Sequence, residues 1–195
     1  EGEPEWYSGT HAEVGDYLRK LDWENSALLC HNTMFDAAIL SFRFNIKPMF
    51  LFDTLSMARA VLGVTTSMRL AVLAEHFGLG VKGTEVEDAK GIRRVDFSPE
   101  HLAQYGSYCC NDVDLTYKLY QELDKGFPVK EKKIIDLTIR MFSEPSLVLD
   151  KVRLQDHLLR VQQRKDALLS TVLMDKEFLM SNEKFATALQ ACGVQ

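Results

Sequence analysis

Three residues have the types and spacing to share one hydrolytic site. Asp36 follows a short apolar run and stands in the first turn of an expected helix, where its carboxylate can point out of a sheet edge. Tyr108 and Asp112 are four residues apart and therefore share a face of a helix, with Cβ atoms about 5–6 Å apart. Carboxylate oxygens suit Mg²⁺, and a nearby phenol can hold a water for attack. Taken singly, an acidic residue near a helix N-terminus and an i/i+4 surface pair are equally ordinary interpretations.

Short strands alternating with helices are expected to position these residues. The apolar runs at 26–30 and 50–54 predict two strands. Asn32 is a good N-cap for the helix that follows the first strand, whose inward face we expect to consist of Phe35, Ala38, Ile39 and Phe42. This alternation indicates an α/β fold.

Helix signals fill most of the remaining first section. Thr10 and Glu13 predict a capping box that begins a helix reaching about Lys20. A helix after the second strand should stop at Gly63, and Ser67 should cap another that ends at Gly78. We expect a long loop from Gly80 to Pro99, one helix beginning at Ser98-Pro99 and a next helix that carries Val113, Leu115, Leu119 and Leu123 to Gly126.

Residues 126–195 are expected to form a helical arm, and 1–125 the α/β section. The arm should break near Pro145 and then carry a long amphipathic stripe, followed by a last short helix from Phe185 to Cys192. Its cationic face fits a solvated surface of a packing helix or a surface that tracks phosphates. The sequence alone leaves both interpretations open.

Composition excludes several classes of protein. The 195 residues are 46% hydrophobic and 26% charged, with no apolar run of the roughly 20 residues that a membrane span needs. A net charge of −5 argues against coating of nucleic acid by a basic surface. Four cysteines without C-x-x-C spacing argue against a disulfide framework or a zinc site, so we expect a reducing, cytoplasmic location. The chain begins with neither Met nor a secretory pattern, which suggests that it is cut from a longer protein.

Four segments together resemble the 3′→5′ exonucleases of the DEDD superfamily. They are Asn32-x-x-Phe35-Asp36, Asp53-Thr54-Leu55, the stretch from Leu70 to Leu79, and Tyr108-x-x-x-Asp112-x-x-x-Thr116. The tyrosine marks the DEDDy branch. The resemblance implies a ribonuclease H-like fold and two divalent ions, Mg²⁺ or Mn²⁺, that hydrolyse the 3′-terminal phosphodiester.

The resemblance also assigns roles to residues. Asp36 and Asp112 match metal ligands, and Tyr108 matches the residue that orients the attacking water. Asn32, as a helix cap, would lie near the terminal nucleotide, and Phe35 could pack beside the end base, although a core position is the stronger expectation for it. Asp53 is expected to be structural.

More narrowly, two segments look like bacteriophage family A DNA polymerases, in which a proofreading domain precedes the polymerase. They are Val81–Glu85 and Leu137–Pro145. Residues 126–195 would then connect the exonuclease toward the polymerase thumb. The implied partners are the 3′ end of single-stranded DNA and a polymerase domain in the parent chain, in the host cytoplasm if a phage encodes it, and no membrane.

The family's first motif, Asp-x-Glu on an opening strand, would supply two of the four carboxylates. We find it on no expected strand, because Glu1-Gly2-Glu3 matches it in spacing only and lies in a polar stretch that contains proline. We therefore expect the opening strands to precede Glu1 and the chain itself to bind metal poorly and be inactive. A catalytically inactive, exonuclease-like scaffold or linking module is the alternative, and a nuclease acting on RNA is a third.

Other polar residues are weaker candidates. We expect His31 to be structural or exposed, since it lacks an evident acidic partner. Four basic residues near the long loop could contact phosphate, but a solvated loop is the simpler interpretation; they are Arg69, Lys82, Arg93 and Arg94.

Overall fold

The computed structural model describes residues 2–63, 65–83, 91–171 and 176–194, which form two compact units. The first unit runs from Glu1 to Ser146 and the second from Leu147 to Gln195. Each unit is described by itself below. Among the described residues, no helix combines the length and apolar character needed to cross a bilayer.

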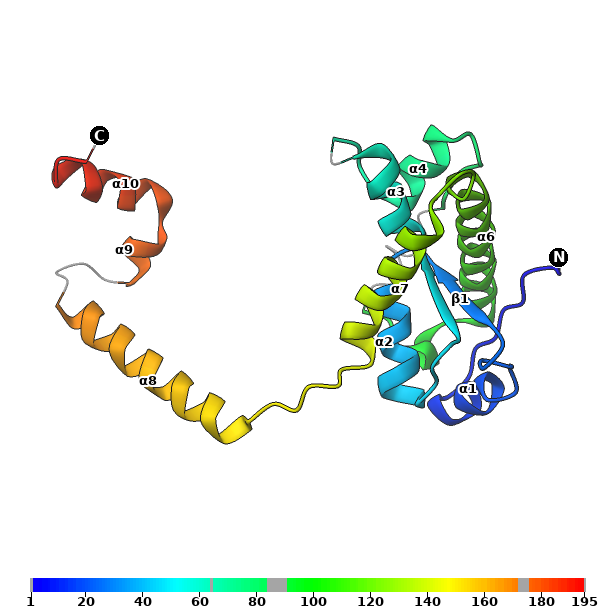
Figure 1. The fold of residues 1–195 in the computed structure, drawn as a ribbon, viewed down its shortest axis with the longest axis horizontal. Helices are drawn as coiled ribbons and strands as arrows, with labels where there is room; N and C mark the ends of the chain where they lie inside the picture. The colour runs from blue at the N-terminus through cyan, green and yellow to red at the C-terminus, as the bar shows by residue number, and fades with distance from the viewer. Residues whose placement is uncertain (1, 64, 84–90, 172–175, 195) are drawn as a thin grey trace. The chain divides into compact units, whose positions relative to one another are not determined.

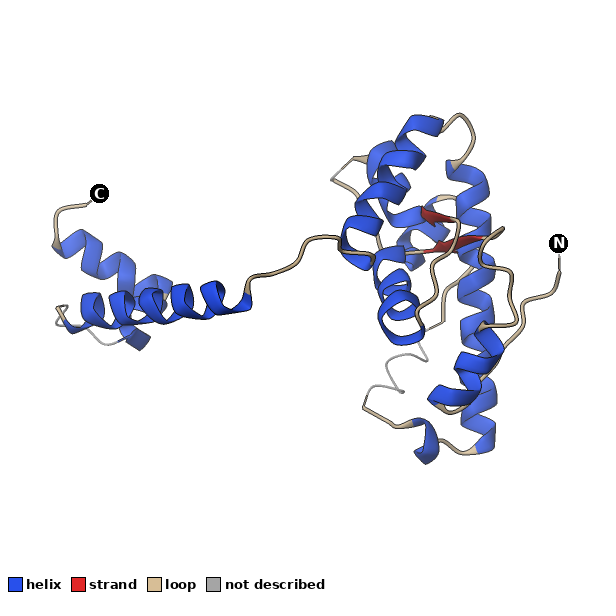
Figure 2. Cartoon of the chain, turned by 60° about the horizontal axis from the view of Figure 1, so that its bottom comes forward, coloured by secondary structure: helices blue, strands red, loops and turns tan. Residues whose placement is uncertain are grey.

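The first unit is a mixed α/β structure, mostly helical, around two parallel strands. β1 (Ala27–Cys30) pairs in register with β2 (Phe50–Asp53), so that Cys30 lies beside Asp53 and both strands end at the same edge. The strands lie between α6 (Pro99–Leu123) on one side and α2 (Thr33–Phe44) with α7 (Val129–Ser143) on the other (Figures 1 and 2). Each strand is followed directly by a helix, since α2 comes after β1 and α3 (Thr54–Leu62) after β2.

Three further elements complete the described part of the first unit. They are α1 (His11–Leu18), α4 (Leu70–His76) and a single 3₁₀ turn at Arg94–Asp96. The Thr10–Glu13 capping box predicted for α1 is confirmed, because each side chain bonds the other's backbone amide. The middle of the long loop expected from Gly80 to Pro99, residues 84–90, lies outside the described residues.

Two clusters of buried side chains hold these elements together. The larger joins α3, α4 and α6 through Met57, Leu73, Leu115 and Leu119, each at most 1% exposed. The smaller joins one residue from each of three elements, namely Ala37 of α2, Leu51 of β2 and Ile139 of α7. The burial of apolar area in both clusters supplies the main driving force for folding.

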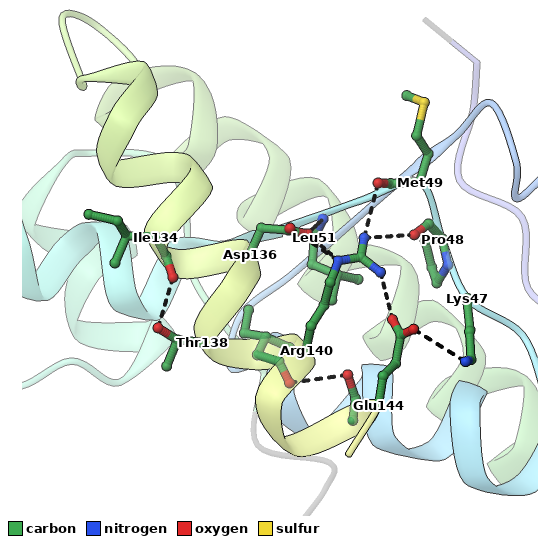
Figure 3. Close-up of polar contacts among 11 residues, drawn as sticks. Lys47, Pro48, Met49, Leu51, Ile134, Asp136, Thr138, Arg140 and Glu144 are labelled. Carbon is green, nitrogen blue, oxygen red and sulfur yellow. Dashed lines mark hydrogen bonds and ion pairs between the residues drawn. The ribbon is translucent and has the colours of Figure 1, made fainter. Parts of the chain in front are cut away.

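Arg140 of α7 fastens that helix to the sheet (Figure 3). Its guanidinium donates to Asp136 and Glu144 on its own helix and to the carbonyl oxygens of Pro48 and Met49, 2.9 and 3.0 Å away, just before β2. Asp136 in turn accepts a 2.9 Å hydrogen bond from the backbone N–H of Leu51. The first compact unit therefore extends through α7, beyond the boundary expected at residue 125.

Helix boundaries in the first unit depart most from the predictions at two places. Residues 99–123 form one 25-residue helix, where two were expected. Gly106 in its middle fits there because Trp6 lies against it, and a Cβ would stand 2.7 Å from the indole ring. α4 begins at Leu70 with Arg69 at its N-cap, so the prediction that Ser67 caps it was wrong.

The predicted inward face of α2 was also wrong. Its buried residues are Thr33, Ala37 and Leu40, whereas Phe35 and Phe42 are 63% and 59% exposed. The small side chains face the strands and α7 because the helix packs closely there, which leaves the large rings outside. Phe35 is therefore a surface residue and not the core residue expected.

The second unit is helical, as predicted. It contains α8 (Lys151–Ser170), α9 (Lys176–Met180) and α10 (Asn182–Ala191), and a break near Pro145 precedes it. None of its described residues is buried. α10 begins three residues earlier than expected because Ser181 caps it through the N–H of Lys184.

Candidate active site

A pocket of about 500 Å³ opens at the carboxyl ends of the two strands. Its polar lining consists of His31, Asp36, Arg69, Lys82, Asp112 and Thr116. These residues come from the end of β1, from α2, from the segments around α4 and from α6. The structure therefore brings Asp36 and Asp112, which are 76 positions apart in sequence, to one cavity.

Asp53 organises the edge from which the pocket opens. It is 4% exposed, and its carboxylate accepts hydrogen bonds from the backbone N–H groups of Asn32 and Thr33 at the start of α2. It also caps α3 by accepting from the N–H groups of Leu55 and Ser56, and from the Ser56 hydroxyl. One carboxylate thus satisfies the free amides of two helix N-termini, and the structural role predicted for Asp53 is confirmed.

Asn32 occupies the N-cap position of α2, as predicted, but it does not cap the helix through its side chain. Asn32 has left-handed backbone geometry, with φ 79° and ψ 51°, and its side chain makes no capping hydrogen bond. Asn tolerates this conformation better than most residues do, which suits the tight turn between β1 and α2. Asp53 reaches across from β2 to supply the cap instead.

Asp36 lies half-buried in the first turn of α2 and lines the pocket. Burial raises the pKa of its carboxyl group above the ordinary value, and the nearby Asp53 charge acts in the same direction, against a lowering by the Cys30 thiol. The Cys30 thiol has a raised pKa, first because it is buried and then because Asp36 lies beside it. The Cys30 thiol is therefore protonated at neutral pH and can donate a hydrogen bond to the Asp36 carboxylate.

Asp112 and Tyr108 share one face of α6, as their spacing predicted, and Lys82 joins them. The Lys82 ammonium donates a 2.6 Å hydrogen bond to the Tyr108 hydroxyl and forms an ion pair with Oδ2 of Asp112. It also lies 4.6 Å from the centre of the Tyr108 ring. Tyr108 is 8% exposed and is not among the residues that line the pocket, so it is linked to the site through its contacts with Lys82 and Asp112.

The protonation of this trio follows from its surroundings. Burial acts to lower the pKa of Lys82, but the hydrogen bonds and charges of Asp112 and Tyr108 outweigh it and raise the pKa. The pKa of Tyr108 is raised, chiefly by burial and then by the Asp112 carboxylate. At neutral pH Lys82 is therefore an ammonium and Tyr108 a phenol, which leaves the phenol able to donate to a water.

His31 is held by the fold and is not free to act as a base. Its Nδ1 lies 2.9 Å from the Thr54 hydroxyl and its Nε2 lies 2.8 Å from the carbonyl oxygen of Met68. Burial lowers the pKa of the ring, so the neutral form predominates at neutral pH. The structural role predicted for His31 is confirmed.

Sequence reasoning missed the role of Lys82, which was expected to be solvated in a loop. No local sequence pattern predicts this role, because the partners of Lys82 on α6 are 26 and 30 residues away in sequence. Asn32 and Phe35, predicted to contact substrate, do not line the pocket, although both belong to the turn and helix start that carry Asp36.

The letters Asp-x-Glu do occur, at Asp22-Trp23-Glu24 and at Asp175-Lys176-Glu177, whose aspartate lies outside the described residues. The first set precedes β1, and the carbonyl of Trp23 accepts from the N–H of Met49, just before β2. It therefore lies at the amino ends of both strands, whereas the pocket lies at their carboxyl ends. The Asp22 carboxylate accepts hydrogen bonds from the backbone and side-chain N–H groups of Asn25 in a turn. This motif is therefore not part of the site.

The donor set of the pocket fits one divalent ion that shares its shell with a substrate. Oδ1 of Asp112 is buried and has no hydrogen-bond partner, and Asp36 faces the same cavity. Mg²⁺ is commonly held by one or two carboxylates, with waters and substrate phosphate completing its octahedron. Within the described part of the chain, no group of three or more His, Cys, Asp or Glu side chains is arranged to hold a metal. The described residues therefore do not form a complete set of ligands for two metal ions.

Comparison with known proteins agrees with this geometry. The family model for the 3′–5′ exonuclease of family A DNA polymerases matches residues 10–127, which is more than half of the chain and includes Asp36, Lys82, Tyr108 and Asp112. No curated protein and no solved structure matches the chain. On the family match, the chain belongs to the 3′–5′ exonuclease domain family of the family A DNA polymerases.

Proposed function

We propose that this chain is the proofreading 3′→5′ exonuclease region of a family A DNA polymerase and that Asp36 and Asp112 form its metal-binding site. The observation that carries the proposal is the meeting of these two carboxylates in one pocket, in a chain of this family. The substrate is the 3′ end of single-stranded DNA, and the fold is of the ribonuclease H type.

Each site residue has a task in hydrolysis of the terminal phosphodiester. Asp36 and Asp112 hold Mg²⁺ or Mn²⁺, and the bound metal supplies a polarised phosphoryl oxygen and an activated water. The Tyr108 hydroxyl orients the attacking water from the α6 side. Asn32 and the exposed ring of Phe35, on the turn and helix start beside Asp36, contact the terminal nucleotide, with Phe35 offering a stacking surface to its base.

The position of the chain in its parent enzyme is also part of the proposal. The segments Val81–Glu85 and Leu137–Pro145 look like those of phage polymerases, and the exonuclease match ends at residue 127. In the structure the second of these segments includes Arg140, which fastens α7 to the sheet. Residues 126–195 thus begin as a helix of the exonuclease unit and continue as the helical connection toward a polymerase thumb.

A catalytically inactive, exonuclease-like module is the second candidate. The observation that favours it is the donor set, because among the described residues two carboxylates line the pocket and one of them is paired with Lys82. Such a module would still bind a 3′ end but would turn it over poorly. The trimming assay described in the next paragraph separates the two candidates.

The test is Mg²⁺-dependent trimming of a 3′-labelled single strand by the complete parent protein, since this chain alone is expected to be inactive. We expect Asp36→Ala and Asp112→Ala to abolish trimming, because each removes a metal ligand. Asp114→Ala is the matched control, since Asp114 lies on the same helix two residues beyond Asp112, pairs with Lys118 and is 44% exposed. It should trim at the parental rate.

The other outcomes decide between the candidates. A chain that binds the 3′ end through Asp36 and Asp112 but leaves it intact is the inactive module. If both alanine variants trim as fast as the parent, the site assignment is wrong. Tyr108→Phe should lower turnover and leave strand binding nearly unchanged, and a pure binding defect would reassign that residue.

A further inference from the structure

Lys82 occupies the position in the pocket that a metal ion would compete for. Its ammonium is ion-paired with Oδ2 of Asp112, while Oδ1 of the same carboxylate is buried without a partner. The Lys82 side chain is only 20% exposed, and that of Asp112 is 26% exposed. The pair is thus largely withdrawn from water. Away from water, the attraction between two charges is stronger and less screened by salt.

The fold places Lys82 there by three contacts with α6. Gly80 has φ 137°, and a Cβ at that position would stand 3.2 Å from the Leu115 side chain. The amide of Asn111 donates to the carbonyl oxygen of Val81 at 3.1 Å. The Lys82 side chain then contacts Tyr108, one turn before Asn111 on α6, and Asp112, the residue directly after it. The backbone just before the lysine is therefore anchored, and the ion pair does not depend on a freely moving side chain.

The balance of charge in the pocket makes this contact consequential. Among the described residues that line it, two carboxylates, Asp36 and Asp112, face two cations, Lys82 and Arg69. A divalent ion that binds Asp112 must enter beside the Lys82 ammonium, and like charges at that distance repel. The repulsion is relieved when an anion enters the pocket with the metal, because the ammonium can then pair with that anion.

We propose that Lys82 couples metal binding to substrate binding: it holds Asp112 and Tyr108 in place while the pocket is empty of metal, and it transfers its ion pair from Asp112 to the phosphate of the strand end when a divalent ion binds. The inference rests on the proposed function and deepens it. Lys82 is a positioning residue for metal and phosphate. When the Lys82 ammonium moves from Asp112 to the phosphate, the Tyr108 hydroxyl also becomes free to contact the attacking water.

Manganese titration of the full chain, read by the electron paramagnetic resonance of free Mn²⁺, tests the coupling without any turnover. Thymidine 5′-monophosphate serves as the phosphate probe. In the parent chain, the nucleotide should tighten Mn²⁺ binding by about tenfold, within the usual range for coupling between two sites. Lys82→Met should bind Mn²⁺ about tenfold more tightly without nucleotide, and the nucleotide should then add little.

Two further variants keep the result interpretable. Lys118→Met removes a lysine from an exposed ion pair on α6 outside the pocket, and it should titrate like the parent chain. Lys82→Gln removes the charge and retains a hydrogen-bond donor for Tyr108, so it should repeat the Lys82→Met result if the methionine variant folds poorly. Equal or weaker Mn²⁺ binding in both Lys82 variants overturns the proposal.

Failure of the coupling and failure of the proposed site are distinguishable. If Asp112→Asn abolishes Mn²⁺ binding but the Lys82 variants titrate like the parent, the metal site stands and the coupling falls. If Asp112→Asn leaves Mn²⁺ binding unchanged, the proposed site itself falls. Absence of Mn²⁺ binding in the parent and in the Lys82 variants, with nucleotide present, contradicts both.

Discussion

Asp53 and Asp112 stand near the same edge of the sheet, yet their surroundings are opposite. Asp53 accepts five hydrogen bonds, four from backbone N–H groups and one from a hydroxyl. Asp112 faces a cavity, pairs with one lysine and keeps one buried oxygen without a partner. Proteins seldom leave a buried polar atom unsatisfied, and Oδ1 of Asp124 is a second case among the described residues. Asp112 differs from Asp124 because its carboxylate also lines the pocket, which makes it the candidate for binding a ligand.

The comparison separates two tasks that sequence alone assigns to the same residue type. A carboxylate whose acceptor sites are filled by the fold stabilises the fold and has little capacity left for a metal. A buried carboxylate with an oxygen that accepts no hydrogen bond lowers stability, and that oxygen is available to bind a ligand. The predictions below follow this division, from the largest expected effect on stability to the smallest.

Asp53→Ala should destabilise the first unit most, by about 3 kcal/mol, because it leaves the N-termini of α2 and α3 without their cap. Trp6 and Trp23, the two tryptophans of the chain, both lie in the first unit, so urea unfolding followed by their fluorescence measures this unit alone. Asp112→Ala should cost clearly less. Equal losses would remove the distinction between the two aspartates.

Arg140→Ala should cost about 2 kcal/mol in the same measurement, because α7 would lose its bonds to the segment before β2 and Asp136 would lose its cation, while Glu144 would keep Lys47. Arg93→Ala is the matched control, since its pair with Asp96 is exposed and lies in the first unit, which the tryptophans report. That variant should unfold like the parent. A similar loss in both would mean that the Arg140 contacts add nothing to the fold.

His31 predicts a dependence of stability on pH. Its pKa is lowered in the folded protein from the ordinary value of 6.5, so below that pH the unfolded chain binds a proton that the folded chain resists. This contribution to stability is present above pH 6.5 and is lost as the pH falls through the folded pKa. His31→Gln should flatten that part of the curve. His101→Gln, at an exposed position, should leave the curve unaltered.

Phe35→Ala should change the unfolding free energy by less than about 0.5 kcal/mol, because the ring is 63% exposed. Its predicted effect is on substrate, with binding of a single-stranded 3′ end weakened by about 1–3 kcal/mol through loss of base stacking. Phe42→Ala, on the same helix and 59% exposed, is the control for stability and for binding. Identical binding by the two variants would withdraw the stacking role.

The local parts of the fold were predictable from sequence. The Thr10–Glu13 box, the two strands and the stop at Gly63 depend on residues within a few positions of one another. The need for glycine at position 106 of α6 was not predictable, because it depends on Trp6, a hundred residues away, which lies where a side chain would stand. The prediction for the inward face of α2 failed for a related reason, since Ala37 packs against Leu51 of β2 and Ile139 of α7, contacts that the periodicity of α2 does not encode.

The candidate site shows the same limit. The positions of Asp36 and Asp112 followed from strand, turn and helix patterns, and the structure places both at one pocket. The capping of α2 by Asp53 and the pairing of Lys82 with Asp112 are contacts across 20 and 30 residues. Such contacts are set by tertiary packing, and no periodicity or capping signal encodes them.

The central claim is that Asp36 and Asp112 are ligands of one metal site. A crystal of the chain grown with Mn²⁺ and thymidine 5′-monophosphate, with the metal located by its anomalous scattering, tests it directly. We predict a peak in contact with Oδ1 of Asp112 and a carboxylate oxygen of Asp36, at about the 2.1 Å typical of a small divalent ion, with the phosphate beside Lys82. A peak bound elsewhere, with the Lys82–Asp112 pair intact, would contradict the account.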